Sequence, residues 1–156
     1  AYVVPMLVPT ALGLLARREH SRVELARKLA PHAESAEELE ALLDDLCARR
    51  LLSDERYVEM RLNARAARFG NARLAHELRT QGVSDELVST ALAESADELT
   101  RARQVWQRKF GDNAVSSEDS PEKRASDRAR QMRFLMSRGF SGETIRCVLR
   151  GGHDDD

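Results

Sequence analysis

Apolar residues recur every three or four positions along most of this chain, and that spacing predicts amphipathic α-helices. The pattern is clearest in mid-chain, where Leu74, Ala75 and Leu78 mark one face of a predicted helix. Gly82 follows and can adopt, at no steric cost, the positive φ that often ends a helix. Ser84 can then cap a second helix through its side-chain oxygen. This stretch therefore predicts two helices joined by a turn at one glycine.

The same signals recur near the C-terminus in the same order. Gly139 and Ser141 repeat the turn glycine and the capping serine. Phe140 and Ile145 flank this second cap, which is the arrangement of a hydrophobic staple. A weaker copy lies upstream, over residues 20–30. Three copies of one helical element predict a tandem repeat array.

Capping signals and breakers place the other elements. Thr10 can cap the first helix, with Leu12 and Leu15 inside. Ser53 can cap the first helix of the middle repeat, which is expected to run to about Arg68. Structural turns are expected at Gly70, Gly82 and Gly139.

The predicted helices group in threes, so we expect an all-α chain of three tandem three-helix repeats. The expected divisions are an extended N-terminal arm over 1–9, repeats over 10–50, 53–93 and 95–150, and a disordered tail over 151–156. Aromatic residues make up only 4% of the chain, so the cores must be built from Leu, Ala, Val and Met. That composition favours helices over strands.

Charge is unevenly distributed along the chain. The formal net charge is −1, although 33% of the residues are charged. Acidic residues dominate 34–45, whereas basic residues dominate 61–79 and 123–138. This asymmetry suggests an acidic or polyanionic partner. The alternative is a solvated helix surface that binds nothing.

No arrangement of residues predicts catalysis or metal binding. The chain has no phosphate-binding glycine loop and no HExxH zinc motif. Its histidines are scattered, and none stands at ligand spacing from another histidine or a cysteine. We therefore expect no enzymatic activity, no cofactor and no metal site.

The cysteines and the apolar N-terminal segment indicate a cytoplasmic protein. Cys47 and Cys147 each fall in a predicted helix and are interpreted as small apolar residues in a reducing compartment. The apolar segment is too short to span a bilayer and is interrupted by Pro5 and Pro9. We expect a monomer that does not associate with membranes.

Helix-turn-helix elements can also read duplex DNA by placing the second helix in the major groove. Here the second helix of the middle repeat carries Asp85 and Glu86, and the helix over 35–50 is acidic. Neither offers the Arg, Asn or Gln side chains that read base edges. Sequence-specific DNA binding is therefore disfavoured, whereas electrostatic contact with a nucleic-acid backbone stays open.

From about residue 11 to residue 150, the chain resembles the RecX family, which regulates the RecA recombinase. The most specific likeness is in RRLLSDERYVEMRLNARAARFGNARLAHELRTQGVSDELV, with its Leu-Ser-Asp start, Arg-rich helix, Phe-Gly pair, and then Glu-Leu and Gly in fixed order. The segments ARREHSRVELARKL and KFGDNAVSSEDSPEKRASDRARQMRFLMSRGFSGETI resemble the family's first and third repeats.

The resemblance implies an elongated, curved array that binds in the groove of the RecA–single-stranded DNA filament. It also implies inhibition of RecA ATPase, strand exchange and coprotease activities, within recombination, DNA repair and the SOS response. The RecA filament and its single-stranded DNA are thus the expected partners. The near-neutral charge and the acidic first repeat favour protein contacts over strong binding to free DNA.

The basic segments supply the expected contact residues for that filament. They are Arg61, Arg65, Arg68, Arg73, Arg79, Lys123, Arg124, Arg128, Arg130 and Arg133. Arg61, Arg65 and Arg68 stand at i, i+4 and i+7, so they are expected on one face of a helix. Arg73 could instead be structural, pairing with Glu77 at i+4. Two other functions stay open, a helix-turn-helix DNA-binding module and a helical-repeat scaffold for a different partner.

Overall fold

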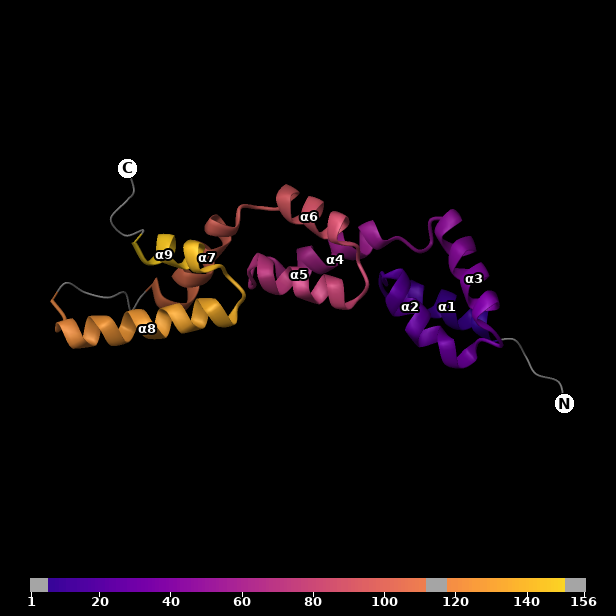
Figure 1. The fold of residues 1–156 in the computed structure, drawn as a ribbon, viewed down its shortest axis with the longest axis horizontal. Coiled ribbons are helices and arrows are strands. Elements are labelled where there is room, and N and C mark those ends of the chain that lie inside the picture. The colour runs from indigo at the N-terminus through magenta and orange to yellow at the C-terminus, as the bar shows by residue number, and fades with distance from the viewer. Residues whose placement is uncertain (1–5, 112–117, 151–156) are drawn as a thin grey trace. The chain divides into compact units, whose positions relative to one another are not determined.

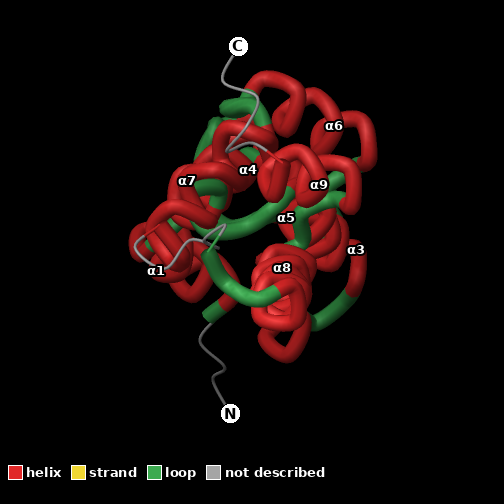
Figure 2. Tube along the Cα trace, turned by 90° about the vertical axis from the view of Figure 1, so that its left-hand side faces the viewer, coloured by secondary structure: helices red, strands yellow, loops and turns green. Residues whose placement is uncertain are grey.

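The computed structural model describes residues 6–111 and 118–150. Every regular element within these ranges is helical, and none of the described residues forms a strand (Figures 1 and 2). The prediction of an all-α chain is therefore confirmed. The predicted tail over 151–156 lies outside the described residues.

The chain divides into two compact units, each described separately below. The N-terminal unit contains the chain up to Arg61 together with Leu78–Val88. The C-terminal unit contains Leu62–Glu77 and the chain from Ser89 onward. The segment of the predicted middle repeat is thus shared between the two units.

Local capping starts the helices of the N-terminal unit. Its elements are α1 (Leu7–Arg17), α2 (Arg22–Leu29), the short 3₁₀ helix η1 (Ala30–His32), α3 (Ala36–Ala48), the first part of α4 (Asp54–Arg65), the end of α5 (Asn71–Thr80) and the start of α6 (Asp85–Glu94). The backbone N–H of Glu24 donates to Ser21 Oγ at 3.0 Å, and that of Glu38 donates to Ser35 Oγ at 3.1 Å. These serines satisfy N–H groups that have no partner within their helices.

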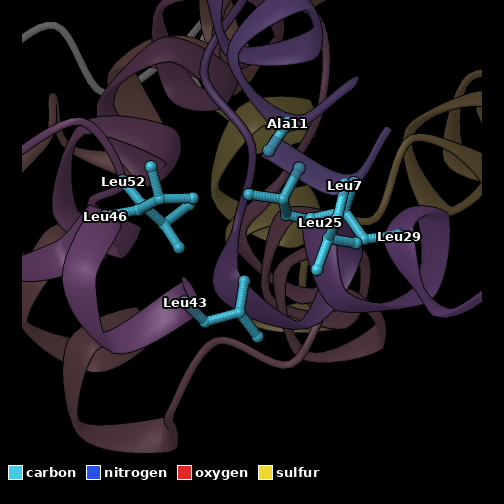
Figure 3. Packing of buried hydrophobic residues seen from close by; sticks show 7 residues of the cluster. All are labelled: Leu7, Ala11, Leu25, Leu29, Leu43, Leu46 and Leu52. Atoms are coloured by element: carbon cyan, nitrogen blue, oxygen red, sulfur yellow. The ribbon is translucent and has the colours of Figure 1, made fainter. Parts of the chain in front are cut away.

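Leucines from three helices form the core of the N-terminal unit (Figure 3). The core consists of Leu7 and Ala11 of α1, Leu25 and Leu29 of α2, Leu43 and Leu46 of α3, and Leu52 beyond α3. None of them is more than 3% exposed. Burial of these aliphatic side chains, at roughly 1.5–3 kcal/mol each, is the main force holding the three helices together.

The predicted start of the first helix was wrong. Helix α1 begins at Leu7 rather than at Thr10, so residues 7–9 of the predicted arm are helical. Pro9 is tolerated because it lies in the first turn, where its missing N–H has no helical partner to lose. Leu7 and Ala11 therefore face the core, whereas Leu12 is 44% exposed. The rest of the predicted arm, residues 1–5, lies outside the described residues.

The turn glycines behave as predicted. Helix α5 (Asn71–Thr80) is followed by Gly82 at φ 78°, before α6 (Asp85–Glu94). Helix α8 (Pro121–Ser137) is followed by Gly139 at φ 89°, before α9 (Gly142–Arg150). Only glycine adopts such angles without strain. A Cβ atom at Gly82 would also collide with the side chain of Val23.

Helices α7 (Glu98–Phe110), α8 and α9 enclose the second core, in the C-terminal unit. Its buried residues are Ala102, Val105, Leu135, Phe140, Ile145 and Val148. Phe140 and Ile145, the predicted staple, are 5% and 1% exposed.

The interpretation of Cys47 as a small, packed apolar residue was wrong. Cys47 is exposed on α3.

Candidate anion-binding surface of the C-terminal unit

A tight backbone contact positions the basic side chains of the C-terminal unit. The chain turns between α4 and α5 at Phe69 and Gly70, and the Gly70 N–H donates to the carbonyl oxygen of Arg138 at 2.7 Å. A Cβ atom at Gly70 would collide with the carbonyl group of Gly139. Glycine at position 70 therefore allows this turn to pack against the end of α8. The same contact places Arg138, which follows α8, beside the turn.

Four guanidinium groups surround the buried ring of Phe69. Their central carbons lie 4.4 Å (Arg65), 5.4 Å (Arg68), 4.2 Å (Arg73) and 5.2 Å (Arg138) from the ring centroid. The negative face of an aromatic ring attracts cations at such distances. The Phe69 ring thus contacts arginines from α4 and the turn after it, from α5 and from the end of α8.

Two of these four arginines pair with the same glutamate, Glu77. Arg65 donates to both carboxylate oxygens of Glu77, at 2.7 Å each, and the two side chains are only 23% and 21% exposed. Arg73 Nε lies 3.5 Å from Glu77 Oε1, and Arg73 also donates to the carbonyl oxygen of Ser137. The predicted pairing of Arg73 with Glu77 is therefore confirmed, and Arg65 pairs with the same glutamate.

The side chain of Arg101 in α7 binds the same turn through hydrogen bonds. It was not predicted from the sequence to have a structural or functional role. It is 4% exposed and donates to the carbonyl oxygens of Ala66 (2.9 Å) and Phe69 (2.8 Å) and to Asn71 Oδ1 (2.8 Å). Burial lowers the pKa of Arg101, and the nearby charges of acidic residues at the start of α7 oppose that shift only in part. Arg101 is thus a structural cation, unavailable to a partner.

The prediction of one arginine face on the first helix of the middle repeat was wrong at Arg68. Helix α4 ends at Arg65, and Arg68 lies in the turn that follows. Arg68 is exposed, whereas Arg61 and Arg65 are half-buried. Arg79, also predicted as a contact, pairs with Asp85 at 2.7 Å on the surface of the N-terminal unit.

A cationic cleft opens beside the Phe69 cluster. Its lining consists of Arg68, Arg108, Lys109, Arg138, Val105 and Phe134, and its volume is about 230 Å³. Among the described residues, no carboxylate forms an ion pair with any of these four cations. The cleft therefore carries a local excess of positive charge in a chain whose total charge is near zero.

Three of these four cations were missed as site residues. Arg108 and Lys109 stand in the last turn of α7, and Arg138 is the C-cap of α8. A sequence signal was available, since each of the three precedes a glycine, Gly111 or Gly139, by one to three positions, and glycine often follows the end of a helix. What the sequence could not supply was their convergence with Arg68, which depends on packing between distant segments.

The basic residues of α8 divide into paired and unpaired groups. Lys123 lies 3.3 Å from Asp119 and 3.8 Å from Asp127, and Arg130 lies 3.6 Å from Asp127. Arg128 and Arg133 are exposed, and no ion pair of theirs occurs in the described part of the chain.

Arg124 shares a shallow groove with Arg128. The groove has a volume of about 290 Å³ and is completed by Pro121 and Ala125. Arg124 Nε is buried there and has no hydrogen-bond partner among the described residues. This groove is a second, smaller concentration of positive charge on the same unit.

The acidic segment of the N-terminal unit is partly neutralised. Arg22 of α2 donates to Glu40 and Asp44 of α3, at 2.7 Å each. These hydrogen bonds, and above all the one that Arg22 donates to Asp44, raise the pKa of Arg22. The charge asymmetry predicted from the sequence is therefore smaller on this unit than the counts of acidic residues suggest.

Over residues 6–111 and 118–150, no group of histidine, cysteine, aspartate or glutamate side chains could hold a metal ion. None of the described helices is both long enough and apolar enough to cross a membrane.

Comparisons with known proteins identify relatives of this chain by sequence and by fold. The RecX model for the second three-helix domain matches residues 53–92, and that for the third three-helix domain matches residues 96–149. A "Regulatory protein RecX" of Leptothrix cholodnii is 51% identical over 148 residues, covering 94% of this chain and 89% of the relative. Its namesake from Herminiimonas arsenicoxydans is 46% identical, covering 94% and 92%. The crystal structure of RecX from Lactobacillus salivarius shares the fold, with a TM-score of 0.76 at 18% identity, covering 92% of each chain.

Proposed function

The chain belongs to the RecX family, and from that premise we propose that it is a regulatory protein that binds the RecA–single-stranded DNA filament. In this proposal it restrains the ATPase, strand-exchange and coprotease activities of RecA without catalysing a reaction or requiring a cofactor. It acts as a monomer in the cytoplasm. Relatives that carry the name regulatory protein RecX cover most of the chain and support the regulatory role.

The observation that carries the proposal is the unpaired positive charge of the C-terminal unit. A filament that exposes DNA phosphates and acidic side chains attracts such a surface, and association is faster when the charges are complementary. The arginines already paired with Glu77 or buried under the turn contribute little to this attraction. The proposed contacts are therefore the cations of the cleft together with Arg128 and Arg133.

In this proposal, binding to the filament surface accounts for the inhibition, because a bound molecule that spans neighbouring RecA subunits restrains them together. One bound molecule then affects several subunits. Inhibition is accordingly expected at fewer molecules of this protein than of RecA.

A RecA ATPase assay on single-stranded DNA tests the proposal. The parent chain is compared with the double variant Arg128→Glu and Arg133→Glu, in which two exposed and unpaired side chains change sign. A matched control, Arg17→Glu with Arg50→Glu, makes the same change of charge on two exposed residues of the N-terminal unit that form no ion pair within the described residues. Inhibition should weaken in the first variant and much less in the control. A parent chain that leaves RecA ATPase unchanged would refute the proposal.

The duplex-reading alternative has less support. The second helix of a helix-turn-helix element must carry base-reading side chains on its exposed face. On α6 the exposed residues Asp85 and Glu86 would face the negatively charged groove instead. Sequence-selective duplex binding that persists at raised salt would revive this alternative.

A further inference from the structure

We propose that the cationic cleft binds a phosphate group, belonging either to a nucleic-acid backbone or to a free nucleotide. This inference deepens the proposed function and rests on it, because it names the ligand chemistry of one part of the same surface. Four cations line a cleft of about 230 Å³ without a carboxylate among the lining residues. Like charges held this close repel one another, and a bound anion removes that repulsion.

The contrast with neighbouring arginines shows that the absence of acid is local. Arg65 is matched by Glu77 and Arg130 by Asp127, each within the same unit. Arg108 has only the carbonyl oxygen of Ala67 as a hydrogen-bond acceptor among the described residues. Carboxylates therefore pair with arginines around the cleft, whereas among the described residues none pairs with the cations that line it.

The cleft is also held in shape before any ligand arrives. Arg108 Nη2 donates to the Ala67 carbonyl oxygen at 2.5 Å. The guanidinium of Arg138 lies 5.2 Å from the ring of Phe69 and 5.0 Å from that of Phe134. Lys109 Nζ lies 5.5 Å from the ring of Phe134. Side chains fixed in this way lose less conformational entropy when an anion binds.

The number and type of the cations favour phosphate over carboxylate. A guanidinium presents a planar fork of N–H donors that matches phosphate oxygens in pairs. Three such forks and an ammonium exceed what one planar carboxylate can accept, whereas a tetrahedral phosphate offers oxygens on several sides. Arg68 and Lys109 are exposed, so the ligand can be reached from solvent and can continue beyond the cleft as a chain.

The test measures binding in the absence of RecA. A fluorescently labelled oligothymidylate is titrated with the parent chain and with the double variant Arg68→Ala and Lys109→Ala, both exposed positions. Affinity should fall about tenfold, and the salt slope should shrink by about 1.4, since each single-strand phosphate contact contributes about 0.7. The control Arg17→Ala with Arg49→Ala removes the same charge elsewhere. The charge-conserving variant Arg68→Lys with Lys109→Arg should keep most of the affinity.

Competition identifies the source of the phosphate. If ATP or pyrophosphate displaces the oligonucleotide from the parent but not from the alanine variant, the cleft accepts free phosphates. If only unlabelled oligothymidylate displaces the labelled strand, the cleft binds the phosphates of a nucleic-acid backbone. Equal affinity of parent and alanine variant, an equal loss in the control, or displacement by polyglutamate at lower concentration than pyrophosphate would each overturn the inference. RecA ATPase measured in parallel separates the two ideas, because a parent that binds oligothymidylate through the cleft but leaves RecA unaffected refutes only the proposed function.

Discussion

The Nζ of Lys28 lies 3.0 Å from Nε2 of His20, a residue that is only 1% exposed. The other ring nitrogen, Nδ1, lies 3.1 Å from the carbonyl oxygen of Arg18. An ammonium group can only donate, so Nε2 accepts and the proton of the neutral ring sits on Nδ1, which donates to the carbonyl. Protonating Nε2 would place two N–H donors against each other.

This contact predicts that acid destabilises the N-terminal unit. Burial is the largest effect and lowers the pKa of His20, and the hydrogen bond to the Arg18 carbonyl oxygen is the main effect that opposes it. The charges of Arg18 and Lys28 lower the pKa further, and that of Glu24 raises it, so that the net shift is downward. The unfolded chain therefore binds the proton more readily. Stability is retained above the unfolded pKa of about 6.5 and declines as the pH falls below it, until the folded pKa is passed.

Denaturant unfolding between pH 7.5 and pH 5 measures the effect. The parent should lose stability over this range, and a His20→Asn variant should lose less because it has no ring to protonate. An NMR titration in which His20 titrates above 6.5 in the folded chain would contradict the prediction.

A second prediction concerns the turn glycines. Gly82→Val should destabilise the chain by about 1 kcal/mol or more, because a β-branched residue tolerates φ 78° poorly and its Cβ would meet Val23. Gly13 is the matched control, since it lies inside α1 with open space where a Cβ would be added. Gly13→Ala should stabilise by roughly 0.5–1 kcal/mol. Urea denaturation of both variants decides whether backbone conformation separates them.

What the sequence predicted well was encoded within a few residues. Ser53 and Ser84 cap the helices that follow them, and Gly82 and Gly139 adopt positive φ, because these effects depend on side chain and backbone within one turn. The core stripe of α5, with Leu78 at 1% exposure, follows from helical periodicity in the same way.

What the sequence missed depends on packing between distant segments. Arg101 is buried because the turn at residues 66–71 offers it carbonyl oxygens, and nothing in the neighbourhood of Arg101 announces those acceptors. Helix α4 likewise ends at Arg65, just before Phe69 packs among arginines. Arg68 therefore lies in the turn and not on the predicted helix face. The candidate cleft joins residues some 70 positions apart, from Arg68 to Arg138, which no local pattern can reveal.

A third prediction tests the structural role of Arg101. Arg101→Leu should destabilise the chain by about 2–4 kcal/mol, since the carbonyl oxygens of Ala66 and Phe69 would lose a charged donor in a buried place. Arg101→Lys should recover little of this loss, because one ammonium cannot reach acceptors that the planar guanidinium contacts with three nitrogens. Guanidinium denaturation with full recovery in the lysine variant would contradict a role that depends on the shape of the side chain.

The last prediction separates a structural arginine from an available one on the same turn. Arg65 donates two hydrogen bonds to Glu77 while the pair is only 23% and 21% exposed, whereas Arg68 is exposed and forms no ion pair within the described residues. Arg65→Glu should therefore destabilise the chain, because it places two carboxylates together beside Phe69. Arg68→Glu should stay within about 0.5 kcal/mol of the parent, as is usual for exposed positions. A double-mutant cycle with Arg65→Ala and Glu77→Ala should give a coupling energy of about 1 kcal/mol. Its absence, or equal destabilisation by the two charge reversals, would show that the Phe69 cluster does not distinguish its arginines as the contacts indicate.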